Sequence, residues 1–410
     1  MTATTGERGL PASTRDTGPR RNASLSDVLR LVHERGPVTR SRIAAELGLS
    51  RSGVRMLITE LCDYGLVAER PGEPPGTAGR PSLIVEVTQS AVASLAVQIR
   101  SDVLYAAQAG LGGRLGPIEQ ADRQPRRFRP AETVHDIAGL VAPILHELTA
   151  RHVRLAGIGI AFGGLVRMDD GFVFASPALG WRDVPLASLI AARLGVPGQV
   201  PVFVGNDGDL GALAEHLLSA NAQRRTFLYV YADIGVGGGI VIDGRPLLPS
   251  RSSASEIGHI VVNPDGIMCR CGNRGCWESE IGADALLRQA NRKPIPHQAA
   301  AVDELIADAS GGNPDALDAI RGHARWVGMG LASLANILAP DLISLGGLLA
   351  RLFPLESEVI HTEISRRVQP PLQANLAVRA SKLGSNAPLA GAGTLALEPV
   401  LANPSLLKSS

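Results

Sequence analysis

The sequence has few cysteines, no long apolar run and almost no net charge. Its 410 residues include four cysteines, too few for a disulfide framework. Three of them, Cys269, Cys271 and Cys276, lie close together, which favours a metal site over oxidation. No segment approaches the ~20 consecutive apolar residues of a membrane span, and the polar N-terminus lacks the apolar core of a signal peptide. We therefore expect a cytoplasmic protein with no membrane partner.

The formal net charge is +1, which excludes the strong overall field of a non-specific polyanion binder. Any contact with nucleic acid must therefore come from a local basic patch. The length is sufficient for about two or three domains.

Changes in composition and periodicity divide the chain into four segments. Residues 1–22 are polar without an apolar period, which predicts a disordered arm. Residues 23–90 have a helical pattern followed by two strands. Residues 91–400 alternate strands and helices, which indicates an α/β domain with a small lobe at about 91–205 and a large lobe at about 206–385. Residues 401–410 are predicted to be a tail.

The segment 23–90 predicts a winged helix-turn-helix. A Gly48-Leu-Ser50 turn separates the second helix from the third, and two strands flank a loop rich in Gly and Pro at 71–81. In such a module the start of the third helix enters the major groove, and the wing reaches toward a minor groove. The residues that we expect to contact DNA are therefore Ser50, Arg51, Ser52, Arg55 and Arg80. For any single arginine, a plain solvated surface role remains the alternative.

The densest chemical signal is Glu256-Ile-Gly-His259, followed by Cys269-Arg-Cys-Gly-Asn-Arg-Gly-Cys276-Trp-Glu278. One imidazole (His259) and three thiolates (Cys269, Cys271, Cys276) fit a closed tetrahedral zinc site. With no open coordination position, such an ion has a structural role. The alternative is three free cysteines in a loop.

This stretch closely resembles the signature of the ROK family (repressors, open reading frames and kinases). Further matching pieces are Gly164-Leu-Val, Ser176-Pro-Ala-Leu-Gly-Trp, Gly346-Gly and Gly391-Ala-Gly, whereas Ser255 stands where the family usually has Gly. The resemblance extends to the winged-helix half found in the xylose-type and N-acetylglucosamine-type repressors. It implies a winged helix-turn-helix followed by a two-lobed, actin-like and ribonuclease-H-like ATPase domain. It also implies a sugar site formed by Asn206, Asp207, Glu256, His259 and Glu278. For Asn206 and Asp207 alone, a capped helix start is the alternative.

Kinases of this family need two phosphate-binding turns, and both are altered here. In the first, Gln98 replaces the carboxylate and Arg100 replaces a glycine. In the second, Asp233 and Ile234 precede the glycines of 235–239 and place a negative charge where a phosphate would lie. Since phosphoryl transfer depends on positioning and electrostatics, we expect no enzyme activity, and Asp207 becomes a vestigial catalytic base.

The resulting hypothesis is a transcriptional regulator of carbohydrate metabolism, a repressor that binds double-stranded operator DNA as a homodimer or homotetramer under the control of a sugar effector. One alternative is a sugar kinase with a DNA-binding appendage. Another is a DNA-binding protein that needs no ligand and uses its C-terminal domain only for dimerisation.

Overall fold

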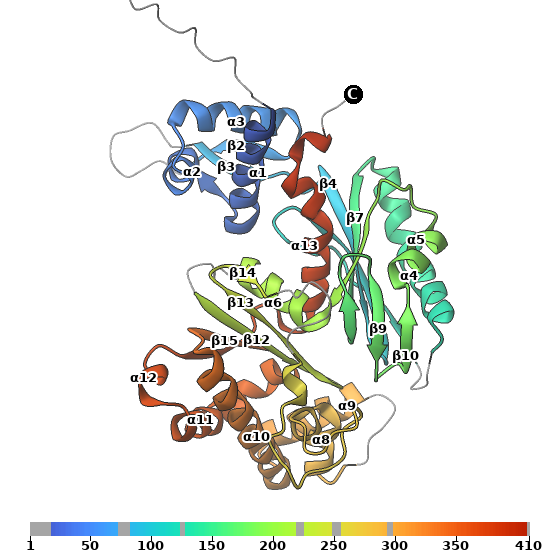
Figure 1. Cartoon of the computed structure of the whole chain (residues 1–410), viewed down its shortest axis with the longest axis vertical. Helices are drawn as coiled ribbons and strands as arrows, with labels where there is room; N and C mark the ends of the chain where they lie inside the picture. The colour runs from blue at the N-terminus through green and yellow to red at the C-terminus, as the bar shows by residue number, and fades with distance from the viewer. Residues whose placement is uncertain are drawn as a thin grey trace, which may run out of the picture.

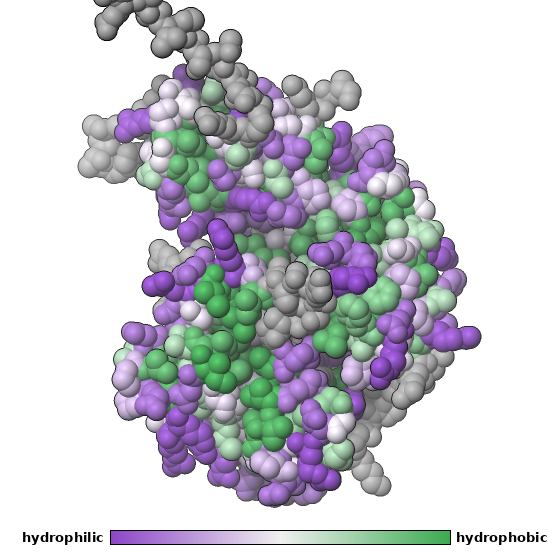
Figure 2. All heavy atoms as spheres, in the orientation of Figure 1, coloured by the Kyte–Doolittle hydropathy of each residue, from purple (hydrophilic) through white to green (hydrophobic). Residues whose placement is uncertain are grey.

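The computed structural model describes residues 18–72, 83–123, 128–218, 225–247, 256–292 and 298–407. An N-terminal helical module and two α/β lobes meet along one C-terminal helix (Figure 1). Figure 2 shows hydrophilic side chains over much of the face in view, with hydrophobic ones gathered mainly on the lobes. Among the described helices, none combines the length and hydropathy that a membrane span requires.

The N-terminal module is the predicted winged helix-turn-helix. Its elements are α1 (Gly18–Arg35), β1 (Val38–Thr39), α2 (Arg40–Leu47), α3 (Arg51–Asp63), β2 (Val67–Pro71) and β3 (Leu83–Val87). Gly48 ends α2 at φ +63°, and the Ser50 hydroxyl caps α3 by accepting from the Gly53 amide at 3.1 Å. The apolar side of α3 is buried against the module's core at Val54, Leu57, Ile58 and Leu61.

Two features of this module differ from the sequence prediction. Helix α1 begins at Gly18, inside the segment that we expected to be an arm, and residues 1–17 lie outside the described residues. The two predicted wing strands are present as the antiparallel pair β2 and β3, and the short strand β1 adds to them to give a three-stranded sheet in the order β1-β3-β2. Arg80 of the wing loop and Ser255 also lie outside the described residues.

The small lobe has a five-stranded sheet in the order β11-β7-β4-β5-β6 beside a three-stranded sheet β10-β9-β8. The strands are β4 (Val92–Ile99), β5 (Val103–Gly110), β6 (Glu119–Asp122), β7 (Arg154–Phe162), β8 (Leu165–Arg167), β9 (Phe172–Ser176), β10 (Trp181–Val184) and β11 (Val202–Asn206). Helices α4 (Pro130–Ala150) and α5 (Leu186–Leu194) cover one face of the larger sheet. Because side chains alternate along β4, Leu95 and Val97 face these helices while Ser94 and Ala96 face the opposite side.

The large lobe has a five-stranded sheet in the order β14-β13-β12-β15-β16. Its strands are β12 (Thr226–Ala232), β13 (Val236–Ile242), β14 (Arg245–Pro246), β15 (Leu342–Gly347) and β16 (Ala377–Ala380). Its helices are α6 (Asp207–Leu218), η1 (Ile257–His259), α7 (Glu278–Ile281), α8 (Ala283–Gln289), α9 (Gln298–Ser310), α10 (Pro314–Leu338), α11 (Leu348–Arg367), α12 (Pro370–Gln373) and η2 (Gly384–Asn386). The alternation of strands and helices expected for the α/β domain is therefore present.

Helix α13 (Ala387–Ala402) connects the three parts of the molecule (Figure 1). Its first half packs on α6, β4 and β7. Its second half shares an apolar core with the winged helix-turn-helix, to which it contributes Leu397, Val400 and Leu401. The helix therefore runs from the junction of the lobes to the winged helix.

Polar contacts fix the module onto this helix. The Ser26 hydroxyl donates to the Leu401 carbonyl at 2.7 Å, and Arg30 Nη1 donates to Glu398 Oε2 at 3.0 Å. The short helix η3 (Pro404–Leu407) continues the contact, with Leu407 buried in the shared core. The segment 401–407 is therefore part of a packed interface, in contrast to the tail expected from the sequence.

Candidate functional site

One pocket lies between the two lobes, at the ends of β4, β11 and β12. Its empty volume is about 1020 Å³, including solvent at its open mouth. The residues predicted to bind a sugar come from three separate segments, and the structure places all of them around this pocket: Asn206, Asp207, Glu256, His259 and Glu278.

Asn206 also has a clear structural role. Its Oδ1 accepts from the amides of Gly208 at 2.9 Å and Asp209 at 3.3 Å, which caps α6, and its Nδ2 donates to the Gly164 carbonyl at 3.1 Å. The capped helix start weighed from the sequence is therefore present, with Asn206 as the capping residue instead of Asp207. Asn206 positions the neighbouring carboxylate as well as lining the pocket.

Asp207 lies at the first turn of α6, where its Oδ1 accepts from the Gly208 amide at 2.9 Å. Burial is the main cause that raises the pKa of Asp207 to about 6, although the Gly208 hydrogen bond opposes it. At neutral pH the carboxylate is therefore mostly ionised and able to accept hydrogen bonds from hydroxyl groups.

The predicted metal ligands form a cluster beside this pocket. One ligand atom from each of His259, Cys269, Cys271 and Cys276 lies within 4.8 Å of all the others. His259 Nδ1 is 3.8 Å from Cys269 Sγ, and Cys271 Sγ is 3.6 Å from Cys276 Sγ. Tetrahedral zinc with Zn–S bonds of about 2.3 Å sets ligand atoms about 3.8 Å apart. The donor set and its spacing therefore fit a zinc ion.

The two nitrogens of the His259 ring face different groups. Nδ1 faces the thiols, whereas Nε2 is 3.7 Å from Glu256 Oε2 in the pocket. Glycines at φ +96° (Gly272) and +71° (Gly275) make the turns that gather the sulfurs. Glu278 follows the last cysteine closely and accepts from the Val236 amide at 3.0 Å. The loop that holds the metal cluster thus also supplies residues to the pocket.

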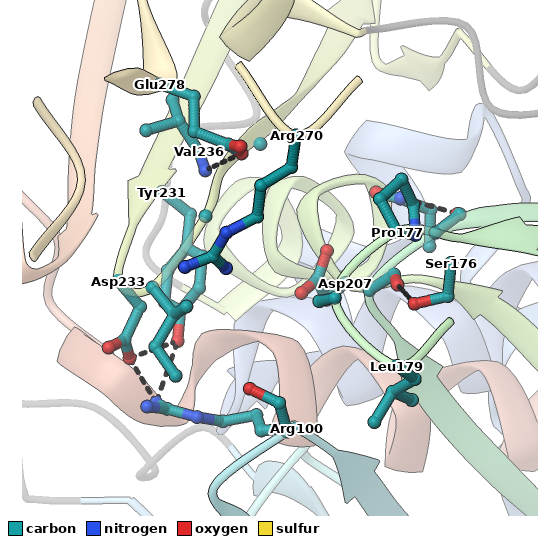
Figure 3. A pocket seen from close by; sticks show the side chains of 18 of the residues that line it. Arg100, Ser176, Pro177, Leu179, Asp207, Tyr231, Asp233, Val236, Arg270 and Glu278 are labelled. Carbon is teal, nitrogen blue, oxygen red and sulfur yellow. Dashed lines mark hydrogen bonds and ion pairs between the residues drawn. The ribbon is translucent and has the colours of Figure 1, made fainter. Parts of the chain in front are cut away.

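The two altered phosphate turns contact each other across the lobes. Arg100, in the turn between β4 and β5, forms an ion pair with Asp233, in the turn between β12 and β13 (Figure 3). The Tyr231 hydroxyl donates to Asp233 Oδ2 at 3.1 Å, and Arg100 Nε also donates to Asp102 Oδ1 at 3.1 Å. The sequence showed an altered residue in each of the two turns without relating them. In the structure, Arg100 and Asp233 form one complementary ion pair.

The glycines of the second turn have a packing role. A Cβ at Gly238 would overlap Ile257 and the Tyr229 carbonyl, and a Cβ at Gly239 would lie 2.6 Å from the Ala212 Cβ. Gly239 therefore allows β13 to contact α6 closely, and Gly238 allows it to contact Ile257 of η1. Gln98 has its Nε2 buried with no hydrogen-bond partner among the described residues, and it does not line the pocket.

Some pocket residues were not assigned a role from the sequence. Ser176–Leu179 line the pocket from the small lobe, where the Ser176 hydroxyl donates to the Gly163 carbonyl at 2.8 Å. Arg270 projects into the pocket from the metal loop (Figure 3). The family resemblance included the first segment, whereas no sequence signal distinguished Arg270.

The predicted DNA-contacting residues of α3 lie on one exposed face. Arg51, Ser52 and Arg55 are exposed, and among the described residues neither guanidinium has an ion-pair partner. Met56 is 55% exposed on the same face, which the sequence analysis missed. The Ser50 hydroxyl caps the helix. A Cβ at position 53 would approach only that hydroxyl, so close packing against α2 does not explain why this position is a glycine.

Comparison with known proteins identifies one family, since the profile described as the ROK family matches residues 112–399. The xylose repressor of Bacillus spizizenii is 26% identical over 376 residues, which cover 91% of this chain and 94% of the repressor. A glucokinase of Streptomyces coelicolor is 31% identical over 313 residues, 71% of this chain and 94% of that enzyme. A solved ROK family transcriptional regulator, described as a homologue of the Escherichia coli MLC protein, has a TM-score of 0.75 at 24% identity over 95% of this chain and 100% of that one. The chain belongs to the ROK family.

Proposed function

We propose that this protein is a transcriptional repressor of carbohydrate metabolism whose affinity for operator DNA is set by a sugar or sugar derivative in the pocket between the lobes. The Arg100–Asp233 ion pair is the observation that carries the proposal. In a kinase of this family the phosphates of a nucleotide would lie at these two turns. Here the turns hold an ion pair and the further carboxylate of Asp102, while the opposite side of the pocket has carboxylates that can bind hydroxyl groups. The full-length similarity to the xylose repressor supports the same function.

In this proposal a zinc ion held by His259, Cys269, Cys271 and Cys276 fastens the loop that carries Glu278. The ion would cross-link the loop and would activate no water, because the four protein ligands would complete its coordination. His259 then orients its free Nε2 toward Glu256 and the effector. Occupancy of the pocket and order of the metal loop are thereby coupled.

The signal reaches the DNA-binding module through α13, which packs on α6 at one end and on α1 at the other. In a homodimer, a change in the angle between the lobes alters the distance between two recognition helices. Operator half-sites repeat about every 34 Å, so this change weakens binding. The effector shifts the equilibrium only by its different affinity for the two states.

The test is a gel-shift titration of the purified chain on DNA from its own promoter region, with and without a panel of monosaccharides. At least one sugar is expected to change the DNA affinity by tenfold or more, a typical allosteric coupling. DNA affinity that no sugar changes, with no sugar binding by calorimetry, would favour the ligand-independent alternative.

A sugar kinase with a DNA-binding appendage is the second candidate, favoured by the 31% identity to a glucokinase and by the presence of Asp207 in the pocket. A coupled assay of ATP consumption with D-glucose and D-xylose separates the two functions. We expect no sugar-dependent turnover. Robust turnover would overturn the role proposed for the Arg100–Asp233 pair.

An Arg51→Ala variant is expected to bind operator DNA about tenfold or more weakly, since a forked arginine contact with a guanine edge contributes about 1–3 kcal/mol. The exposed side chain has no packing role, so the unfolding temperature should not change. Fluorescence anisotropy with labelled operator measures the change. Arg151→Ala removes the same charge from an exposed site on the small lobe and should leave the affinity unchanged. Equal losses in both variants would indicate only a general charge effect.

Sugar affinity is expected to fall as the pH drops through about 6, because burial raises the pKa of Asp207 to about 6. A ligand that binds the ionised carboxylate loses about tenfold in affinity per pH unit below that pKa. Above about pH 7 the affinity should be constant. Calorimetry across this range with the best-binding sugar measures the slope.

Asp207→Asn serves as the control for this slope, since the amide cannot titrate. Its affinity should be lower but independent of pH. Asp209, whose pKa burial raises to about 7, lies nearby but does not line the pocket. A slope that persists in Asp207→Asn would assign the titration to another carboxyl group, either Asp209 or the pocket residue Glu256, because burial raises the pKa of each.

A further inference from the structure

Arg270 has a position in the pocket that the proposed zinc site and the carboxylates do not explain. It lies between two of the cysteines of the metal cluster, and its side chain extends into the pocket between Tyr231 and Asp207 in the view of Figure 3. Nη2 donates to Asp284 Oδ2 at 2.7 Å, and the side chain remains 50% exposed. Among the described residues, no other group binds the remaining N–H donors of this guanidinium.

The rest of the pocket offers mainly acceptors. Four carboxylates line it, from Asp207, Asp233, Glu256 and Glu278. The other side-chain donors are mostly engaged: Arg100 with Asp102 and Asp233, and the Asn206 amide with the Gly164 carbonyl. Arg270 is therefore the principal side-chain donor still open to a ligand.

This excess of hydrogen-bond acceptors over donors limits the chemical groups that a ligand of this pocket can carry. A hydroxyl group both donates and accepts, so it can satisfy a carboxylate by donating its proton. A guanidinium has only donors, and it binds best to oxygens that carry no hydrogen. The carboxylates thus suit the hydroxyl edge of a sugar, whereas Arg270 suits a different kind of substituent.

We propose that Arg270 determines effector specificity by binding a carbonyl, carboxylate or phosphate oxygen outside the sugar ring, so that the effector is a sugar derivative with an acetamido group, a carboxylate or a phosphate. This inference rests on the proposed function of the pocket as an effector site. The ion pair with Asp284 at the start of α8 orients the guanidinium, and the metal loop on either side holds its backbone in place. Asp284 also accepts from Gln298, which anchors it in turn.

Calorimetry with matched sugars tests the proposal on the wild-type chain and on Arg270→Gln. The hydroxyl-only probes are D-glucose and D-xylose. The acceptor-bearing probes are N-acetyl-D-glucosamine, D-glucuronate, D-glucose 6-phosphate and N-acetyl-D-glucosamine 6-phosphate, and their comparison separates a neutral carbonyl from the two kinds of anion. The wild type should bind at least one acceptor-bearing probe about tenfold or more tightly than the hydroxyl-only probes, as expected for a hydrogen bond to a charged group.

Arg270→Gln should lose this preference while its affinity for the hydroxyl-only probes stays unchanged, and Arg270→Lys should recover part of it. Asn273→Ala changes an exposed residue of the same loop and should behave like the wild type. A role limited to fastening the loop would instead lower zinc content, unfolding temperature and affinity for every probe together. Zinc analysis and thermal unfolding of each variant detect that outcome.

Two other results would overturn the inference. Tighter binding of D-glucose or D-xylose than of any derivative, with a normal effect on DNA affinity, would remove the specificity role but leave the repressor function intact. No binding of any probe, together with DNA affinity that no sugar changes, would reject both.

Discussion

A Cys271→Ser variant is expected to be purified almost free of zinc, whereas the wild-type chain should hold about one ion as a closed four-ligand site requires. Serine has no thiolate, and three remaining ligands bind the metal far more weakly. Since Cys271 is exposed, the substitution removes a ligand without opening a cavity in the core. Elemental analysis of the purified chains gives the metal content directly.

The loop itself should respond as well. Without the ion, the segment between His259 and Glu278 loses its cross-link, and we expect its amides to exchange hydrogen faster and sugar affinity to fall with them. Cys62→Ser is the matched control, because Cys62 lies on α3 outside the metal cluster. It should keep full zinc. Full zinc content in Cys271→Ser would remove that residue from the ligand set.

Local signals predicted much of the fold. One short segment contains both the serine that caps helix α3 and the regularly spaced apolar residues that it buries. Both ends of this helix and its buried face were therefore predictable. The start of α1 and the packing of residues 401–407 were not predicted. Leu401 and Leu407 are apolar residues in a short terminal segment, and the partners that bury them are supplied by α1, nearly the whole chain away. No local period can reveal such a contact.

In the pocket, too, features set by residues close in the sequence could be predicted, whereas contacts between distant segments could not. The four metal-cluster residues lie in one motif, and their spacing alone predicted the cluster that the structure contains. Arg100 and Asp233 belong to different lobes, so the sequence identified two altered turns without showing that their charges meet. Gly238 and Gly239 resembled part of a phosphate-binding turn, but their closest neighbours belong to α6 and β12. A glycine run is compatible with either role until its neighbours are known.

A Gly391→Ala variant is expected to show the largest loss of stability among small substitutions on α13. A Cβ at position 391 would overlap the carbonyl group of Leu210 in α6, which is backbone and cannot turn away. Overpacking of this kind costs about 1–3 kcal/mol of unfolding free energy, and more where the backbone must shift. The helix has to move away from α6 next to the effector pocket, while its other end still holds the DNA-binding module through Leu397, Val400 and Leu401. We therefore expect operator DNA to bind with little change in affinity, but sugar no longer to alter that affinity.

Gly139→Ala provides the matched control. Gly139 lies on the exposed face of α4, and a Cβ there meets no atom within 4 Å. Because alanine favours a helix over glycine by about 1 kcal/mol, this variant should unfold at the same temperature as the wild type or slightly higher, with its sugar response intact. Chemical denaturation gives the stability of both variants, and gel shifts with and without sugar give the response. If Gly391→Ala keeps a full sugar response despite reduced stability, the signal must pass to the winged helix by a route other than the contact between α6 and α13.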